Sequence, residues 1–212
     1  MFYNKQEAFN AISHALGAVL AIIGSVFLLI YSFNDLRVFF IALLYSICML
    51  AMFSASAIYH SQKGDNYEKL LARKIDHAAI YLMIAGSYTI ISYLFLPMLY
   101  YIPLIVIEWI VAIVGIYLKL SKKIKKKSIW DTTMYIIMGW LAVLALPYLL
   151  NNLGFARNML LFFGGIAYTV GAIMSYYKKP ILIPGVIEGH EFFHIFIIIG
   201  AALHYILIAS GI

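Results

Sequence analysis

Two histidines near the end of the chain, His190 and His194, have the spacing of metal ligands on a helix. Side chains four residues apart lie on one helix face, with about 5–6 Å between their Cβ atoms, so both imidazoles can reach one ion. Together with Glu191 they also form the sequence H-E-x-x-H, in which the glutamate is the general base of zinc metalloproteases. The spacing therefore predicts a metal site, and the rest of the chain has to decide which kind.

The protease interpretation lacks a third ligand. The extended metzincin pattern requires a histidine at position 200, where this chain has Gly200. The next histidine, His204, lies ten residues beyond His194, too deep in the same apolar segment to close the site without a break in the helix. We therefore look for the remaining ligands elsewhere in the sequence.

The composition excludes a soluble enzyme. Of the 212 residues, 65% are hydrophobic and only 11% are charged, too few charges to cover the surface of a soluble domain. Apolar segments of about 20 residues recur along the whole chain. We expect an all-α integral membrane protein of the cell membrane, with a single seven-transmembrane helix bundle over residues 1–212. The predicted spans are Phe9–Phe33, Val38–His60, Ile75–Leu96, Tyr100–Leu118, Ile129–Leu149, Met159–Tyr177 and Val186–Ile212.

The loop charges predict the orientation. Thirteen lysines and arginines lie at one set of span ends and only Arg37 and Arg157 at the other, so the positive-inside rule puts the N-terminus in the cytoplasm and the C-terminus outside. The net charge of +6 could suggest nucleic acid, but the basic residues sit in short loops between apolar segments. We expect these cytoplasmic loops to contact anionic lipid head groups, with no nucleic-acid partner. The thirteen are Lys5, Lys63, Lys69, Arg73, Lys74, Lys119, Lys122, Lys123, Lys125, Lys126, Lys127, Lys178 and Lys179.

This orientation brings polar residues of four spans to one depth, near the cytoplasmic face. An ionisable residue inside a span is costly and is a functional hypothesis by default. His60 ends the second span, Asp76 begins the third, and His190 and His194 begin the seventh. The first span opens with further polar residues: Glu7, Asn10, Ser13 and His14.

His60, His190 and His194 would supply three neutral imidazoles, and three protein ligands with one open position are typical of catalytic zinc. Copper, nickel and iron also accept imidazole, so ligand type alone leaves them open. Asp76 would act as base for the metal's water, and Ser56, one turn before His60, would face the same cavity.

Other ionisable or helix-breaking residues are given simpler roles. His204 is expected to pack or to form a hydrogen bond, and Asp131 to be an exposed boundary charge. Glu108 lies near the middle of its span, where it either pairs across the bundle, with His204 as one partner, or reaches the outer interface. Pro147 would kink or end its span.

Five motifs occur in order along the chain: Glu7-x-x-Asn10-x-x-Ser13-His14, Ser56-x-x-x-His60, Asp76-His77-Ala78-Ala79-Ile80-Tyr81, Ala85-Gly86-Ser87-Tyr88-Thr89 and His190-Glu191-Phe192-Phe193-His194. This ordered set resembles the hemolysin III family, the bacterial branch of the progestin and adipoQ receptor superfamily that includes the adiponectin receptors. The resemblance implies a seven-helix bundle with zinc near the cytoplasmic face, bound by His60, His190 and His194, with Asp76 contacting it through water and Ser56 as the family serine. A glutamate after the first histidine of the last span is common in the bacterial branch, which weakens the protease interpretation.

The first functional hypothesis is a zinc-dependent intramembrane hydrolase in which Asp76 takes the proton of the attacking water. Because the adiponectin receptors are similar to ceramidases, a membrane lipid with an amide or ester bond is the expected substrate. A second hypothesis is a sensor or regulator of membrane state in which zinc is structural. Cytolysis, which the family name suggests, has no physical support in the sequence, since no span carries a charged stripe and no amphipathic strands are present.

Overall fold

The computed structural model describes residues 4–64, 66–121 and 129–212, and in these ranges the chain consists of helices joined by turns and loops, with one isolated bridge between Ile183 and Ile187. Seven helical segments are long and apolar enough to cross a membrane, as predicted. Residues 131–152 form one of these segments from three consecutive elements, α5, η1 and α6. The elements are α1 (Lys5–Ser32), α2 (Leu36–Ser61), α3 (Tyr67–Phe95), α4 (Met98–Ser121), α5 (Ile129–Trp140), the 3₁₀ helix η1 (Leu141–Ala145), α6 (Leu146–Asn152), α7 (Phe155–Tyr177) and α8 (Gly189–Ala209).

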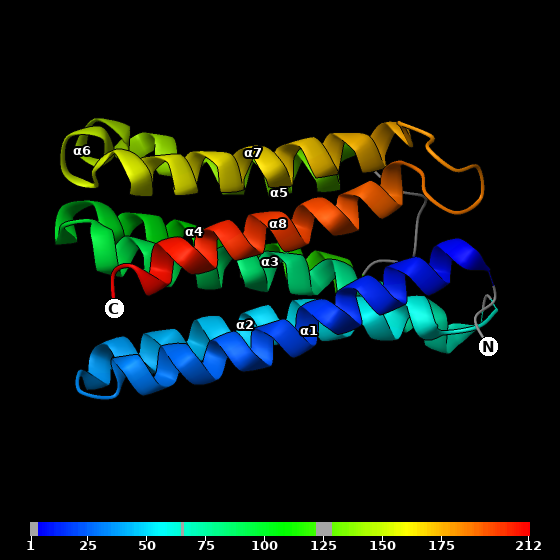
Figure 1. Cartoon of the computed structure of the whole chain (residues 1–212), viewed down its shortest axis with the longest axis horizontal. Coiled ribbons are helices and arrows are strands. Elements are labelled where there is room, and N and C mark those ends of the chain that lie inside the picture. The colour runs from blue at the N-terminus through cyan, green and yellow to red at the C-terminus, as the bar shows by residue number, and fades with distance from the viewer. Residues whose placement is uncertain (1–3, 65, 122–128) are drawn as a thin grey trace.

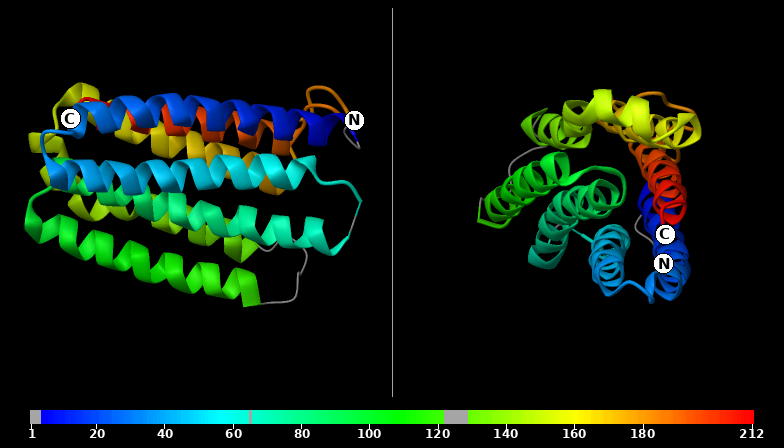
Figure 2. Two further views of the ribbon diagram at one scale, coloured as in Figure 1. Left: turned by 90° about the horizontal axis from the view of Figure 1, so that it is seen from below. Right: turned by 90° about the vertical axis from the view of Figure 1, so that its left-hand side faces the viewer.

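The helices lie side by side along one axis, and the two termini lie at opposite ends of the bundle (Figure 1). Helices adjacent in sequence pack together from α1 to α4, and α7 packs against α8. Helix α8 also packs against α1, so the first and last spans are neighbours (Figure 2). The main core lies among α1, α2, α3 and α8, around the fully buried Tyr45 and Ile208.

Side-chain caps determine where three of the helices begin. The side chains of Asn4, Asp35 and Asn66 accept hydrogen bonds from backbone N–H groups in the first turns of α1, α2 and α3. Helix α8 begins with a capping box: the side chain of Glu188 accepts a hydrogen bond from the backbone N–H of Glu191, and the side chain of Glu191 accepts one from the backbone N–H of Glu188. These caps fix the register of the polar residues at the start of α1 and α8.

The last span differs from its prediction at its start. We predicted Val186, but α8 begins at Gly189. The preceding residues turn back on themselves, with the N–H groups of Leu182 and Ile183 donating to the Ile187 carbonyl. The Pro184–Gly185 pair, in which Gly185 has a φ of 71°, explains why the apolar residues before Gly189 do not extend the helix.

The fifth span is interrupted, as Pro147 predicted, but the irregular stretch lies before the proline. Helix α5 gives way to 3₁₀ geometry over Leu141–Ala145, and Pro147 occupies the first turn of α6. A proline removes one N–H and its ring collides with the carbonyl four residues earlier, here that of Val143. The hydroxyl of Tyr88 partly compensates, because it donates to the Gly139 carbonyl and accepts from the Ala142 N–H.

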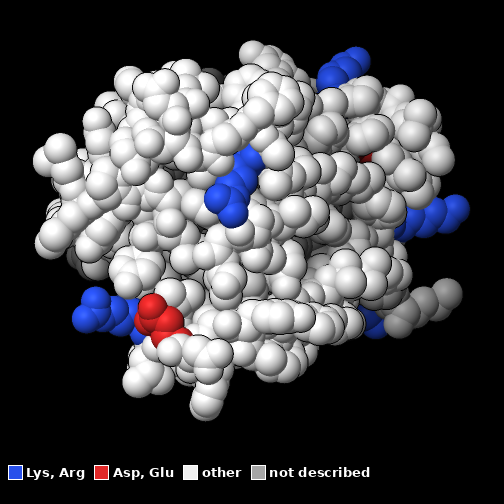
Figure 3. Space-filling view, turned by 60° about the vertical axis from the view of Figure 1, so that its left-hand side comes forward, with Lys and Arg blue, Asp and Glu red and all other residues white. Residues whose placement is uncertain are grey.

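The outer surface is suited to lipid. The face in Figure 3 is almost entirely uncharged, with only a few charged groups on it, most of them near its edges. On α1, Leu16, Val19 and Ile23 are each at least half exposed, with exposed fractions of 56%, 52% and 50%. Exposed apolar side chains of this kind are unfavourable in water but favourable in contact with the lipid chains of a bilayer. The chain is therefore a multi-pass membrane protein.

Candidate metal centre

Three histidines from two helices meet at the end of the bundle where the chain begins. His60 lies in the last turn of α2, and His190 and His194 lie in the first two turns of α8. One ring nitrogen from each lies within 4.8 Å of the other two. Their ring centroids are 5.4 Å apart for His60 and His190, 4.8 Å for His60 and His194, and 5.0 Å for His190 and His194. The clustering predicted from spacing and orientation is confirmed.

The donor set fits a metal ion. Zinc–nitrogen bonds of about 2.0–2.1 Å in a tetrahedron separate neighbouring nitrogens by about 3.4 Å, so small side-chain rotations would close the observed group around an ion. His60 and His194 are buried, with 4% and 1% of their surface exposed. Among the described residues, Nδ1 of His194 has no hydrogen-bond partner. Buried polar atoms are nearly always satisfied, and a bound metal ion would satisfy imidazole nitrogens of this kind.

Two of the rings are held through Nδ1. Nδ1 of His60 lies 2.7 Å from Oε2 of Glu7, and Nδ1 of His190 lies 3.0 Å from the hydroxyl oxygen of Ser175. The Glu7 contact leaves Nε2 of His60 as the nitrogen that a metal could bind. Metal-binding histidines in proteins are usually oriented in this way, through their second ring nitrogen.

A close approach of two helices brings Ser175 to His190. Gly189 begins α8 directly against the end of α7, where a Cβ atom would collide with the carbonyl oxygen of Met174. The absence of a side chain therefore lets the first turn of α8 sit beside the last turn of α7. The sequence contained no signal for the Ser175 contact, because a lone serine in an apolar helix is ordinary.

Asp76 and Ser56 lie beside the histidines, as predicted. Both line a cavity of about 80 Å³ that His14, His190 and His194 also line. Ser56 is buried one turn before His60, and its side chain lies near the Asp76 carboxylate on the wall of the same cavity. The lining of this cavity therefore combines carboxylates, a hydroxyl and imidazoles.

Glu191, the glutamate of the H-E-x-x-H sequence, has a structural role. It is 1% exposed; its Oε1 accepts a 2.9 Å hydrogen bond from the Asn10 amide, and its Oε2 accepts a 3.0 Å hydrogen bond from the Glu188 N–H. A general base must be free to take a proton from water. Both oxygens are engaged in fixing the start of α8, which argues against the protease interpretation.

His204 and Glu108 do not join the cluster. Nε2 of His204 lies 3.2 Å from the Leu161 carbonyl oxygen, and its ring packs against Tyr168, in agreement with the predicted packing or hydrogen-bonding role. Glu108 is completely buried, and neither of its oxygens has a hydrogen bond to any described residue. The pairing of Glu108 with His204 that the sequence suggested is therefore not formed, and burial does not fit a place at the outer interface.

Asp131 is more than a boundary charge. Its Oδ2 lies 2.5 Å from Nζ of Lys119 at the end of α4, and its side chain, 33% exposed, also lines the cavity beside the histidines.

The loop between α4 and α5 lies outside the described residues, so its predicted contact with lipid head groups stays a prediction. It contains Lys122, Lys123, Lys125, Lys126 and Lys127.

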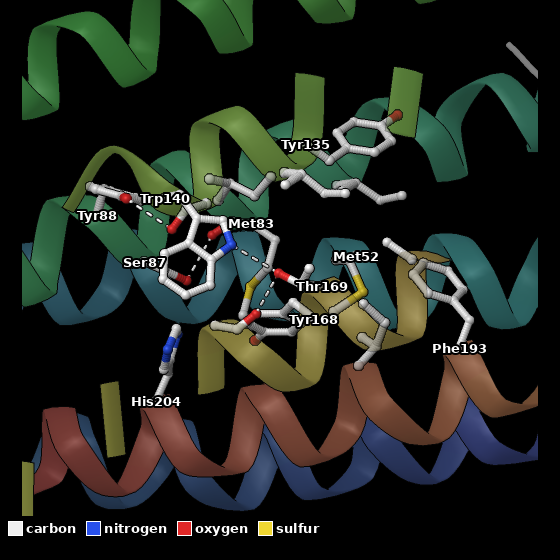
Figure 4. Close-up of a pocket in the computed structure, with 17 residues that line it drawn as sticks. Met52, Met83, Ser87, Tyr88, Tyr135, Trp140, Tyr168, Thr169, Phe193 and His204 are labelled. Carbon is white, nitrogen blue, oxygen red and sulfur yellow. Dashed lines mark hydrogen bonds between the residues drawn. The ribbon is translucent and has the colours of Figure 1, made fainter. Parts of the chain in front are cut away.

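An apolar cavity of about 110 Å³ lies next to the polar one, towards the middle of the bundle (Figure 4). The two share six lining residues, so they adjoin. Figure 4 shows Met52, Met83 and Phe193 around this space, with Trp140 and His204 at the end away from Phe193. The shared residues are Met52, Ile80, Tyr135, Ala172, Phe193 and Ile197.

The fold and the site define a seven-helix membrane protein with a candidate metal centre at one end of its bundle. The model of the haemolysin-III-related family matches residues 2–205, and the chain belongs to this family. It is 36% identical over 209 residues to the hemolysin-3 homolog of Bacillus subtilis (strain 168), covering 95% of this chain and 92% of that protein. It is 35% identical over 205 residues to hemolysin-3 of Bacillus cereus, covering 95% and 89% respectively.

Proposed function

We propose that the chain is an intramembrane lipid hydrolase that binds zinc through His60, His190 and His194. The observation that carries the proposal is the cavity lined by imidazoles, the Asp76 carboxylate and the Ser56 hydroxyl, which adjoins an apolar cavity. A bound zinc ion would act as a Lewis acid, polarising a carbonyl group and making water more acidic. We propose that the centre lies near the cytoplasmic face, as the distribution of lysine and arginine predicts.

The proposed reaction is cleavage of an amide or ester bond by water. Asp76 accepts a proton from the water while the water oxygen adds to the carbonyl carbon. The proton then passes from Asp76 to the leaving nitrogen or oxygen. Breaking the carbonyl bond yields a carboxylic acid and an amine or alcohol, so atoms balance without another reactant. Ser56 orients the Asp76 carboxylate through the contact between their side chains.

The substrate class follows from the walls of the cavities. The space next to the centre is lined by methionine, isoleucine and aromatic side chains, which suit an acyl chain better than a polar substrate. The lipid's carbonyl group would then lie among the histidines and Asp76, with its chain extending between Met52 and Phe193 towards Trp140. An amide-linked lipid of the ceramide type is the first substrate to test.

The test uses purified protein in lipid nanodiscs, loaded with zinc and supplied with a long-chain ceramide and a long-chain ester. The wild type should release the fatty acid, and Asp76→Asn should lower the rate by about 10²–10⁴-fold with its metal content unchanged. Asp35→Asn is the matched control, because Asp35 caps α2 at the other end of the bundle and asparagine also caps well. Hydrolysis that survives in Asp76→Asn, or a zinc-loaded wild type that cleaves neither lipid, would refute the proposal.

A non-enzymatic sensor of membrane state is the second candidate. The observation that favours it is the way the histidine region joins helices: Glu7 of α1 contacts His60 of α2, and Asn10 of α1 contacts Glu191 of α8. A metal ion bound by the three histidines would then mainly stabilise the packing of α1, α2 and α8. In that case an Asp76→Asn variant that still binds its metal would have the same biological activity in cells as the wild type, and neither protein would cleave lipid.

A further inference from the structure

The start of α1 presents three polar side chains on one face, and each contacts a helix that carries a candidate ligand. Glu7, Asn10 and His14 are spaced three and four residues apart, so they lie along one stripe of the helix. Glu7 contacts His60, Asn10 contacts Glu191, and the ring of His14 lies against that of His194 with centroids 3.9 Å apart. None of the three is among the candidate ligands.

Glu7 has the most specific geometry of the three. Its Oε1 accepts a 3.0 Å hydrogen bond from Nζ of Lys69, and its Oε2 lies 2.7 Å from Nδ1 of His60. A carboxylate only accepts hydrogen bonds, so the hydrogen of the second contact belongs to Nδ1 of His60. The neutral imidazole then has its lone pair on Nε2, where a metal ion would need it.

Lys69 holds the far side of Glu7. Its side chain is only 12% exposed, and its Nζ also donates to the Gln62 carbonyl at 3.2 Å and lies over the Tyr59 ring, 5.7 Å from the centroid. The Glu7 carboxylate is therefore fixed between a lysine of α3 and a histidine of α2. Its position does not depend on a flexible surface contact.

We infer that Glu7 is a positioning residue of the metal centre, which sets the tautomer and orientation of His60 and makes it a stronger ligand. The inference rests on the proposed binding of zinc by the three histidines. Carboxylates that bind the second nitrogen of a metal-bound histidine fix the ring and raise its basicity, and removing them typically costs about 10–100-fold in metal affinity.

The experiment measures zinc affinity by competition with a chromophoric chelator, and the visible absorption of the cobalt(II)-substituted protein, in detergent. Glu7→Ala should weaken zinc binding by about 10–100-fold and change the cobalt spectrum. Glu7→Gln should lose less, because an amide oxygen still accepts the hydrogen bond but carries no charge. Glu68→Gln is the matched control, since Glu68 is exposed in the first turn of α3 and should leave affinity and spectrum unchanged.

A Lys69→Met variant separates positioning from a purely structural clamp. If Glu7 acts on His60, this variant keeps the contact between Glu7 and Nδ1, and its zinc affinity should stay within about threefold of wild type. If Glu7 matters only as the partner of Lys69, then Lys69→Met should lose as much affinity as Glu7→Ala, which would overturn the inference.

The outcomes also distinguish this inference from the proposed function. A wild type that binds zinc while Glu7→Ala and Glu7→Gln bind it equally well would refute the role of Glu7 and leave the metal centre standing. A wild type that binds no zinc would refute the metal centre itself. If Glu7→Ala does not fold, Glu7→Gln decides, because it has nearly the same shape as the native side chain.

Discussion

The amide of Asn10, in the second turn of the first helix, donates a 2.9 Å hydrogen bond to the carboxylate of Glu191, in the first turn of the last helix. The bond joins residues 181 positions apart and is buried. It joins the starts of the first and last helices at one site and explains why the glutamate of the H-E-x-x-H pattern is not available as a base. The start of α8, and with it His190, is held from α1.

Asn10→Leu should destabilise the protein without removing a ligand. The substitution leaves the buried Oε1 of Glu191 without its donor, which costs about 1–3 kcal/mol. Thermal unfolding in detergent should show a lower Tm than for Asn152→Leu, whose exposed amide donates to the Tyr148 carbonyl at the other end of the bundle. Equal Tm values for the two variants would mean that the bond between α1 and α8 contributes nothing measurable.

Ala172→Phe should discriminate between long and short substrates. Ala172 lines both the polar and the apolar cavity, so a phenyl ring there would occupy space where they adjoin. A group that takes up part of a hydrophobic substrate pocket typically costs about 1–3 kcal/mol of substrate binding, so hydrolysis of a long-chain lipid should fall by about tenfold or more.

Cleavage of a short, water-soluble ester should fall much less in Ala172→Phe, because that substrate does not need the apolar cavity. Ala202→Phe, on the exposed side of α8, is the control and should behave as wild type. Equal losses on long and short substrates would argue that the apolar cavity does not hold the acyl chain.

The orientation predicted from the loop charges can be tested separately. A fusion of alkaline phosphatase, active only outside the cytoplasm, to the C-terminus should be active, and a fusion in the loop after α4 should be inactive. The opposite pattern would put the histidine cluster at the outer face and overturn the proposed cytoplasmic location.

The helices and the three candidate ligands could be predicted because their signals are local. Apolar segments identify the spans, the four-residue spacing of His190 and His194 puts both on one face, and the loop charges bring His60 to the same end. The interruption of the fifth span was predicted only approximately. Pro147 acts on the turn that precedes it, so the 3₁₀ stretch begins at Leu141.

The residues around the ligands could not be predicted in the same way, because their contacts depend on which helices become neighbours. Nothing in the sequence says that α1 packs between α2 and α8, which is what brings Glu7 to His60. The contact of Ser175 with His190 likewise depends on the close approach at Gly189. The polar residues of α1 were recognised as unusual, but their partners required the fold.

Metal analysis of purified wild type beside the double variant His190→Ala, His194→Ala tests the metal centre most directly. We expect about one zinc ion per chain in the wild type and almost none in the double variant, since one remaining histidine cannot hold the ion. His204→Gln, a change farther along the same helix and outside the cluster, should keep its zinc. Equal zinc content in the wild type and the double variant would contradict the claim that His190 and His194 bind the metal.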